Sequence, residues 1–254
     1  MEENSITERI PNTWQDLQNE VAKLLTESGV EAETDKKMIT PRGEVSIDVY
    51  AEEVIDERKY TIICECKHWR KNIPQTVIHS FRTVVGDIGS NKGYVISLNG
   101  FQSGAYNNVY FTNIELLDWN GFQAIILNSW LLNYFVPVIT KELDQLFEYS
   151  LPINSSVDDK VKQLSENNKV KFRELQKKYS FFGMFVYSSY SKYANVFSDE
   201  KKYPKLPASL PEKQLQELPS SILKAKSYRE LLDETLKFGK QVISELDAFF
   251  VQSS

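Results

Sequence analysis

Three polar side chains in two apolar segments have types and spacing that could hold a metal ion beside a phosphate group. Asp48 lies within the segment VSIDV, and Glu65 and Lys67 lie within IICECK. Side chains alternate between the two faces of a strand, so Glu65 and Lys67 share one face. If the two segments are neighbouring strands of a hairpin, Asp48 lies beside Glu65. Two carboxylates and one ammonium group would then converge.

This trio predicts a metal-dependent hydrolase. Mg²⁺ prefers oxygen ligands and is held by one or two carboxylates, with water and substrate phosphate in its other positions. Asp48 and Glu65 would hold the metal, and Lys67 would orient the attacking water and stabilise transition-state charge. A carboxylate among apolar neighbours also needs a partner to offset its desolvation. The competing interpretation is a solvated strand face, which alternating charges usually indicate.

The surrounding elements predict an α/β (α+β) fold with a mixed central sheet flanked by helices. Apolar residues at helical spacing predict an amphipathic helix over residues 13–28. An antiparallel meander follows, with strands at 30–36, 45–51 and 60–67 separated by turns at 41–43 and 56–59. Further helices and strands alternate at 74–88, 93–98, 101–110, 114–118 and from 120 onward.

The segments GEVSIDVYAEE, CECKHW and KGYVISLNGFQSGA resemble the Mrr-type branch of the PD-(D/E)XK restriction endonuclease-like superfamily, over about residues 13–120. The resemblance implies a restriction endonuclease-like core that hydrolyses DNA with Mg²⁺, for which Mn²⁺ can substitute. Asp48 matches the family's metal-binding aspartate, and Glu65 and Lys67 match its E-x-K pair. An acidic residue on the first helix is also expected as a metal ligand. Glu20 is the candidate there, because the competing Gln18 is not acidic.

The second part of the chain predicts a helical accessory domain. Helical patterning dominates residues 141–254, behind a nuclease domain of residues 1–140, and a Pro-rich stretch at 203–219 predicts a linker or loop. The last helix, over about 227–251, has a broad apolar face. A subunit with one active site needs a second subunit to cut both strands of a duplex, so a homo-oligomer is expected. The apolar face of the last helix is the candidate interface.

Charge is divided unevenly along the chain. The net charge is −5, which argues against a protein that coats nucleic acid. Residues 1–159 carry 13 basic and 24 acidic side chains, whereas residues 160–240 carry 17 and 9. Aromatic residues accompany the cations between 160 and 205, a pattern typical of a nucleic-acid surface and equally of a core or interface helix. The candidate nucleic-acid contacts are Gln75, for which helix capping or solvent exposure is the alternative, and Lys169, Lys171, Arg173, Lys177 and Lys178.

Cysteine use and hydropathy predict a soluble cytoplasmic protein. Cys64 and Cys66 are too close along one strand to bridge each other and lack the further Cys/His pair of a zinc site, so we expect core thiols in a reducing compartment. The N-terminus is polar and acidic, unlike a signal peptide. Polar residues interrupt the apolar stretch 122–139, which predicts a buried helix and no membrane association.

The sequence thus predicts a metal-dependent DNA endonuclease of restriction or anti-phage defence. Its expected partners are DNA and either further copies of the chain or a defence-system protein. The alternative is a nuclease-fold subunit that docks on a partner ATPase or sensor and is active only in that complex, or is inactive. The complete D…ExK set favours the first prediction. The acidic character of residues 1–159 favours the second, because it repels free duplex.

Overall fold

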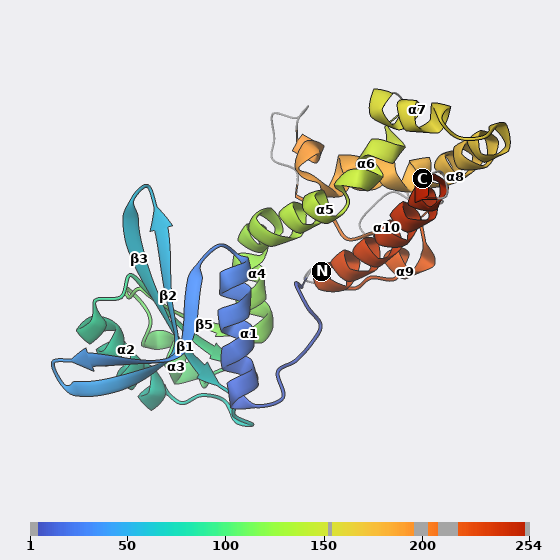
Figure 1. The fold of residues 1–254 in the computed structure, drawn as a ribbon. Helices are drawn as coiled ribbons and strands as arrows, with labels where there is room; N and C mark the ends of the chain where they lie inside the picture. The colour runs from blue at the N-terminus through green and yellow to red at the C-terminus, as the bar shows by residue number, and fades with distance from the viewer. Residues whose placement is uncertain (1–4, 152–153, 196–202, 208–217, 252–254) are drawn as a thin grey trace. The chain divides into compact units, whose positions relative to one another are not determined.

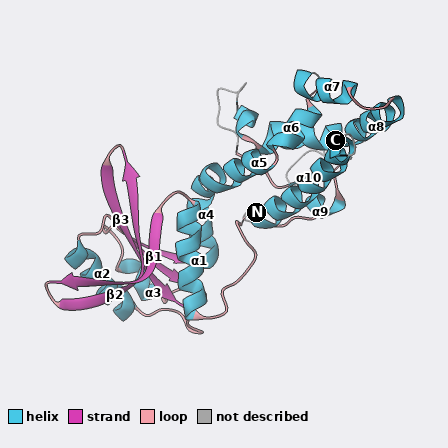
Figure 2. Ribbon diagram, viewed as in Figure 1, coloured by secondary structure: helices cyan, strands magenta, loops and turns pink. Residues whose placement is uncertain are grey.

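The computed structural model describes residues 5–151, 154–195, 203–207 and 218–251 (Figure 1). The chain divides into two compact units, residues 1–133 and 134–254. All strands in the described part of the chain belong to the first unit (Figure 2). The predicted domain limits, 1–140 and 141–254, stay a prediction.

The first unit contains a five-stranded sheet whose strands lie side by side in chain order. The strands are β1 (Glu31–Thr40), β2 (Gly43–Ile55), β3 (Arg58–Lys67), β4 (Lys92–Ser97) and β5 (Ile114–Asp118). β1, β2 and β3 pair antiparallel, whereas β3, β4 and β5 pair parallel. The antiparallel meander and the mixed sheet predicted from the sequence are therefore confirmed.

The strands of the meander are longer than the sequence predicted. At the β2–β3 hairpin, Asp56 and Glu57 adopt positive φ angles of 48° and 64°. Two such residues make a tight turn whose twist matches that of the flanking strands. Two charged residues therefore suffice where four were assigned to the turn, and pairing extends to Ile55 and Arg58.

Helices cover both faces of the sheet (Figure 1). α1 (Trp14–Glu27) and α4 (Trp119–Trp130) contact each other and pack on one face. α2 (Gln75–Ile88) and the short α3 (Ser103–Asn107) form the layer on the other face. This arrangement is the restriction endonuclease-like α/β sandwich that the sequence predicted.

Large apolar side chains fill the layer between the sheet and α2. Ile78, Phe81 and Val85 of α2 are buried there with Ile63 of β3. Burial of each such side chain stabilises the fold by roughly 1.5 to 3 kcal/mol. Gly93 allows α2 to approach β4 closely, because a Cβ atom at that position would lie 2.9 Å from side-chain atoms of both Phe81 and Val85.

One face of β3 changes from apolar to polar toward the end of the strand. Ile63 is fully buried, whereas Glu65 and Lys67, further along the same face, are partly exposed. Cys64 and Cys66 alternate with them and are buried. The polar face therefore begins where the core under α2 ends.

All regular secondary structure among the described residues of the second unit is helical. It contains α5 (Val136–Glu142), α6 (Asp144–Ser150), α7 (Ser155–Lys162), α8 (Glu166–Tyr190), the 3-10 helix η2 (Lys192–Asn195), α9 (Ser220–Leu223) and α10 (Tyr228–Val251). α10 contacts α5, α6 and α8, and its Leu231, Val242 and Leu246 are buried. The apolar face predicted as an oligomer interface is therefore largely used within this unit. Most of the predicted linker at 203–219 lies outside the described residues.

A helical stretch from Trp119 to Glu142 runs through α4, the π-helix η1 (Leu131–Phe135) and α5. It is long and apolar enough to cross a membrane, and 39% of its most apolar window is buried. A core helix of a soluble protein meets the same criteria, and Phe122 and Trp130 are fully buried here. The absence of a membrane association stays a prediction.

Candidate active site

Asp48, Glu65 and Lys67 converge beyond the last paired residues of the β2–β3 hairpin. Lys67 Nζ lies 3.7 Å from Asp48 Oδ2 and forms an ion pair with Glu65 Oε1. The side chains of Lys67, Asp48 and Glu65 are 18%, 22% and 27% exposed. The site is therefore shielded from bulk water yet open to a substrate.

The position of Asp48 follows from the end of the β2–β3 ladder. Pairing runs from Ile55 opposite Arg58 to Val49 opposite Cys64. Beyond that pair, Asp48 Oδ2 accepts a hydrogen bond from the backbone N–H of Cys66 at 2.7 Å. A side-chain oxygen thus takes the acceptor role that a strand carbonyl would have. The carboxylate is fixed against β3 without a further backbone pair.

A kink in β1 occurs at the same level of the sheet. Thr34 pairs with Val49 and Lys36 pairs with Ile47, which leaves Asp35 opposite Asp48. Asp35 has a φ of 54°, in the left-handed region that aspartate tolerates better than most residues. Figure 1 shows the β1–β2 and β2–β3 hairpins pointing in different directions. Asp48 therefore lies where the pairing of β2 with β3 has ended and the pairing of β2 with β1 continues.

Sequence reasoning missed the left-handed backbone of Asp35 opposite Asp48. Its only signal was a strand-disfavoured aspartate inside the β-forming run that contains Lys36. A single aspartate in such a run does not by itself indicate a left-handed residue.

The electrostatics of the trio favour the binding of a cation. Burial, together with the charge of Asp48, raises the pKa of Glu65 above its usual range, and Lys67 opposes this shift. Burial alone would lower the pKa of Lys67, but the two carboxylates outweigh that effect and raise it. Two carboxylates thus share one ammonium group. A divalent cation would stabilise the ionised form of both.

The donor set fits Mg²⁺. Asp48 and Glu65 supply hard oxygen ligands, and Mg²⁺ needs no more than two carboxylates when water and phosphate complete its coordination. Within the described ranges, no three acidic, His or Cys side chains gather closely enough to hold a metal by themselves. An open site completed by substrate is therefore the arrangement that these residues support.

Glu20 is not brought into a cluster with the other two predicted ligands. Its carboxylate pairs with Arg9 Nη1 at 2.9 Å, and Arg9 also binds Asp16 at 2.7 Å. Arg9 belongs to the segment that precedes α1, and no pattern along the chain indicated where that segment runs. The position of Glu20 on a predicted helix was therefore not enough to predict which side chain it contacts.

Gln75 and His68 lie on either side of the loop that follows β3. Gln75 is exposed at the start of α2, and a Cβ atom on Gly104 of α3 would lie 3.4 Å from its Oε1. His68 Nε2 lies 3.2 Å from the carbonyl oxygen of Pro11. His68 therefore lies against the segment that precedes α1.

Cys64 and Cys66 are free thiols in the core, as predicted. They are 0% and 5% exposed. Burial raises the pKa of both thiols, with a smaller contribution from nearby negative charge, so the thiol form is favoured over the reactive thiolate.

Replacing Cys64 or Cys66 with serine should lower the free energy of unfolding by about 1 to 3 kcal/mol, because each hydroxyl would be buried. Activity per folded molecule should persist. Denaturant melts and cleavage assays at matched folded concentration measure the two effects. Alanine at the same position serves as the control without a hydroxyl. A large loss of activity at unchanged stability would show that the thiols take part in the chemistry.

The five predicted cations of the second unit all lie on α8. Lys169 and Arg173 form ion pairs with acidic neighbours, and Lys178 lies 3.0 Å from a tyrosine hydroxyl. Lys169, Arg173 and Lys177, spaced four residues apart, line one shallow hollow of about 400 Å³. Lys171 and Lys178 are not among its lining residues.

The aromatic residues of the same segment are mostly core residues. Phe172, Tyr179 and Tyr190 are buried. Tyr187 stacks on Tyr193 with ring centroids 4.8 Å apart. Of the two interpretations left open by the sequence, packing therefore accounts for these rings. Any attraction of α8 for nucleic acid would come from its cations.

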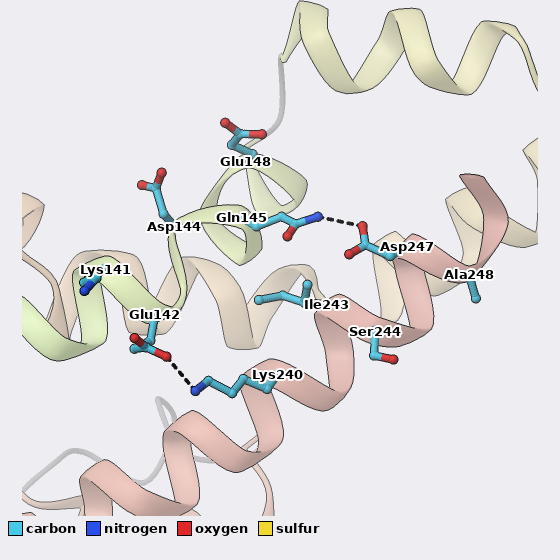
Figure 3. Close-up of a pocket in the computed structure, with 10 residues that line it drawn as sticks. All are labelled: Lys141, Glu142, Asp144, Gln145, Glu148, Lys240, Ile243, Ser244, Asp247 and Ala248. Carbon is cyan, nitrogen blue, oxygen red and sulfur yellow. Dashed lines mark hydrogen bonds and ion pairs between the residues drawn. The ribbon is translucent and has the colours of Figure 1, made fainter. Parts of the chain in front are cut away.

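A separate open cavity lies at the surface of the second unit, between α5, α6 and α10 (Figure 3). Its volume is about 800 Å³. Lys240 pairs with Glu142 at 2.6 Å, and Gln145 binds Asp247 at 2.6 Å, so polar contacts line it on both sides. None of the residues predicted to act in catalysis lines this cavity.

Comparison with known proteins supports the family suggested by the motif. Residues 11–126 match the Mrr_cat family of restriction endonucleases. The matched segment, somewhat less than half of the chain, is therefore similar to the catalytic domain of Mrr-type restriction endonucleases, as the motif indicated. The match covers the trio and every strand of the sheet.

A solved structure and the curated proteins add no functional argument. The crystal structure of a protein of unknown function, AF1548, aligns at 17% identity with 92% of this chain and 100% of that chain, with a TM-score of 0.38. No curated protein matches the sequence.

Proposed function

We propose that this protein is a Mg²⁺-dependent endonuclease that hydrolyses phosphodiester bonds of DNA in restriction or anti-phage defence. The observation that supports this proposal is the convergence of Asp48, Glu65 and Lys67 within an Mrr-like domain. Mn²⁺ is expected to replace Mg²⁺, because both accept carboxylate and water ligands.

Asp48 and Glu65 would hold the metal, and Lys67 would contact the reacting groups. The hydrogen bond from Cys66 and the contact with Lys67 both involve Oδ2 of Asp48, which leaves Oδ1 available as a ligand. When bound, Mg²⁺ polarises the phosphate and lowers the pKa of bound water. Lys67 can donate hydrogen bonds to the attacking water and to a non-bridging phosphate oxygen, and thereby stabilises the negative charge that develops there.

Cleavage of four substrates in parallel tests this function. Supercoiled plasmid, linear duplex, single-stranded DNA and RNA of matched sequence are incubated with the purified chain and Mg²⁺, Mn²⁺ or EDTA. We expect nicked or linear plasmid with either metal and intact plasmid in EDTA. Cleavage that persists in EDTA, or is confined to RNA, would contradict the proposal.

The second candidate is a subunit that cuts only within an assembly with a partner ATPase or sensor. The excess of 24 acidic over 13 basic side chains in residues 1–159 favours this candidate, because it weakens the attraction for free DNA. The isolated chain would then bind Mg²⁺ without cutting any of the four substrates. Calorimetry of Mg²⁺ binding separates such a subunit from one whose metal site is not functional.

The cations of α8 are the candidate source of DNA attraction in the second unit. Replacing Lys169, Lys171, Arg173, Lys177 and Lys178 with alanine should weaken binding of every DNA sequence alike. The slope of the logarithm of the binding constant against the logarithm of salt concentration should become less steep by about 0.9 for each phosphate that the variant no longer neutralises. Cleavage at saturating DNA should be retained. Binding titrations at several salt concentrations provide the measurement.

A matched variant controls for net charge. Lys141, Lys192, Lys224, Lys226 and Lys237 are exposed cations of the same unit outside α8. Their replacement removes the same total charge and should leave the salt slope nearly unchanged. If the α8 variant keeps its salt slope but changes its mass in sedimentation, α8 is an assembly surface instead.

A further inference from the structure

The loop directly after the motif strand presents an aromatic ring and two cations to solvent. Trp69 is 45% exposed, and Arg70 and Lys71 are exposed beside it. Arg70 and Lys71 have no ion-pair partner among the residues that the structure describes. Most other cations of this unit, such as Arg42 and Lys92, are already paired with carboxylates. The loop therefore carries free positive charge in an acidic unit.

The backbone of this loop is held in place by the loop that follows β4. Asn99 Nδ2 donates to the carbonyl oxygen of Trp69, and Asn72 Nδ2 donates to that of Phe101. Ile73 also exchanges backbone hydrogen bonds with this neighbouring loop. An exposed tryptophan on a fixed backbone loses little conformational freedom when it binds a ligand.

The position of the loop places it next to the trio. β3, β4 and β5 are parallel, so the loops after β3 and β4 meet at the same edge of the sheet. Trp69 follows Lys67 by two residues. In open sheets with parallel strands, ligands commonly bind outside the carboxyl ends of the strands. The aromatic ring and the two cations therefore lie at the edge where a substrate would meet Lys67.

We propose that residues 69–71 bind single-stranded DNA beside the trio, with Trp69 stacked on an unpaired base and Arg70 and Lys71 on the neighbouring phosphates. The inference rests on the proposed nuclease function and assigns to it a substrate form. A ring that stacks on bases combined with cations that bind the backbone is the arrangement that single-strand binding requires. Duplex DNA offers the cations its phosphates, but its base faces are covered by neighbouring bases.

Binding measured in EDTA tests this assignment without any cleavage. Fluorescein-labelled single-stranded DNA and the duplex of the same sequence are titrated and followed by anisotropy. Trp69→Ala should weaken single-strand binding by about fivefold or more and leave duplex binding unchanged. Trp69→Phe keeps a ring and should retain most of the affinity. Circular dichroism melts of each variant show whether it is folded.

Replacing Arg70 and Lys71 together with alanine should weaken binding of both DNA forms. For the single strand, the log–log salt slope should flatten by about 0.7 for each phosphate that is no longer neutralised. The control is Arg58→Ala with Lys59→Ala, at the opposite end of β3, which removes the same charge. The aromatic control is Tyr110→Ala, which is 66% exposed and precedes the start of β5. Both controls should leave binding unchanged.

Equal losses on single strand and duplex for a folded Trp69→Ala would overturn base stacking. No loss for either the tryptophan or the double cation variant would overturn the whole assignment. These outcomes are independent of the cleavage assay. A chain that cuts no DNA but shows the single-strand losses contradicts the proposed function and supports this binding site. A chain that cuts DNA without these losses supports the function and contradicts the site.

Discussion

Glu65→Gln and Lys67→Ala should each reduce Mg²⁺-dependent cleavage by about a hundredfold or more in kcat. Glu65→Gln removes an anionic metal ligand while it keeps the shape of the side chain. Lys67→Ala removes the ammonium group that contacts both carboxylates. Single-turnover cleavage at saturating Mg²⁺ and DNA provides the measurement. Full activity in either folded variant would contradict the assignment of the trio.

The same two variants should affect stability in opposite directions in the absence of metal. Glu65→Gln removes one of two neighbouring carboxylates, so the melting temperature should hold or rise. Lys67→Ala leaves Asp48 and Glu65 without their shared ammonium group. It should therefore lower the free energy of unfolding by roughly 1 to 3 kcal/mol, because the ion pair is only partly screened by solvent. Thermal melts in EDTA test this contrast, which a simple solvated strand face would not produce.

Asp48→Asn should abolish most of the Mg²⁺ affinity while it leaves the fold intact. The neutral amide is a poor ligand for a hard divalent cation, but its oxygen can still accept the hydrogen bond from the backbone N–H of Cys66. Calorimetric titration with Mg²⁺ and with Mn²⁺ provides the measurement. An affinity equal to that of the wild type would show that Asp48 is not a ligand.

Asp48→Ala serves as the matched comparison because it removes the acceptor as well as the charge. The backbone N–H of Cys66 would then lose its partner in a partly buried position. The free energy of unfolding should fall by about 1 to 3 kcal/mol relative to Asp48→Asn. If the asparagine and alanine variants have the same stability, the hydrogen bond does not fix the end of β2 against β3.

The sequence by itself determined the local elements and the membership of the trio. Alternation along β3 placed Glu65 and Lys67 on one face, and the hairpin register brought Asp48 to the same level. The helices predicted at 13–28 and 74–88 correspond to α1 (Trp14–Glu27) and α2 (Gln75–Ile88), which the structure shows to be bounded by the Thr13 cap and the left-handed Gly89. These features depend on neighbours within a few residues, so a pattern along the chain is sufficient to predict them.

Only the tertiary structure shows which partner each side chain or surface contacts. Glu20 forms an ion pair with Arg9, and aromatic residues of α8 such as Phe172 are buried. The apolar face of α10 packs against other helices of its own unit. The tertiary structure also places the left-handed Asp35 opposite Asp48. The physical reason is that amphipathic and charged patterns fix the chemical character of a surface but not its partner. That partner depends on how segments distant in the sequence pack together.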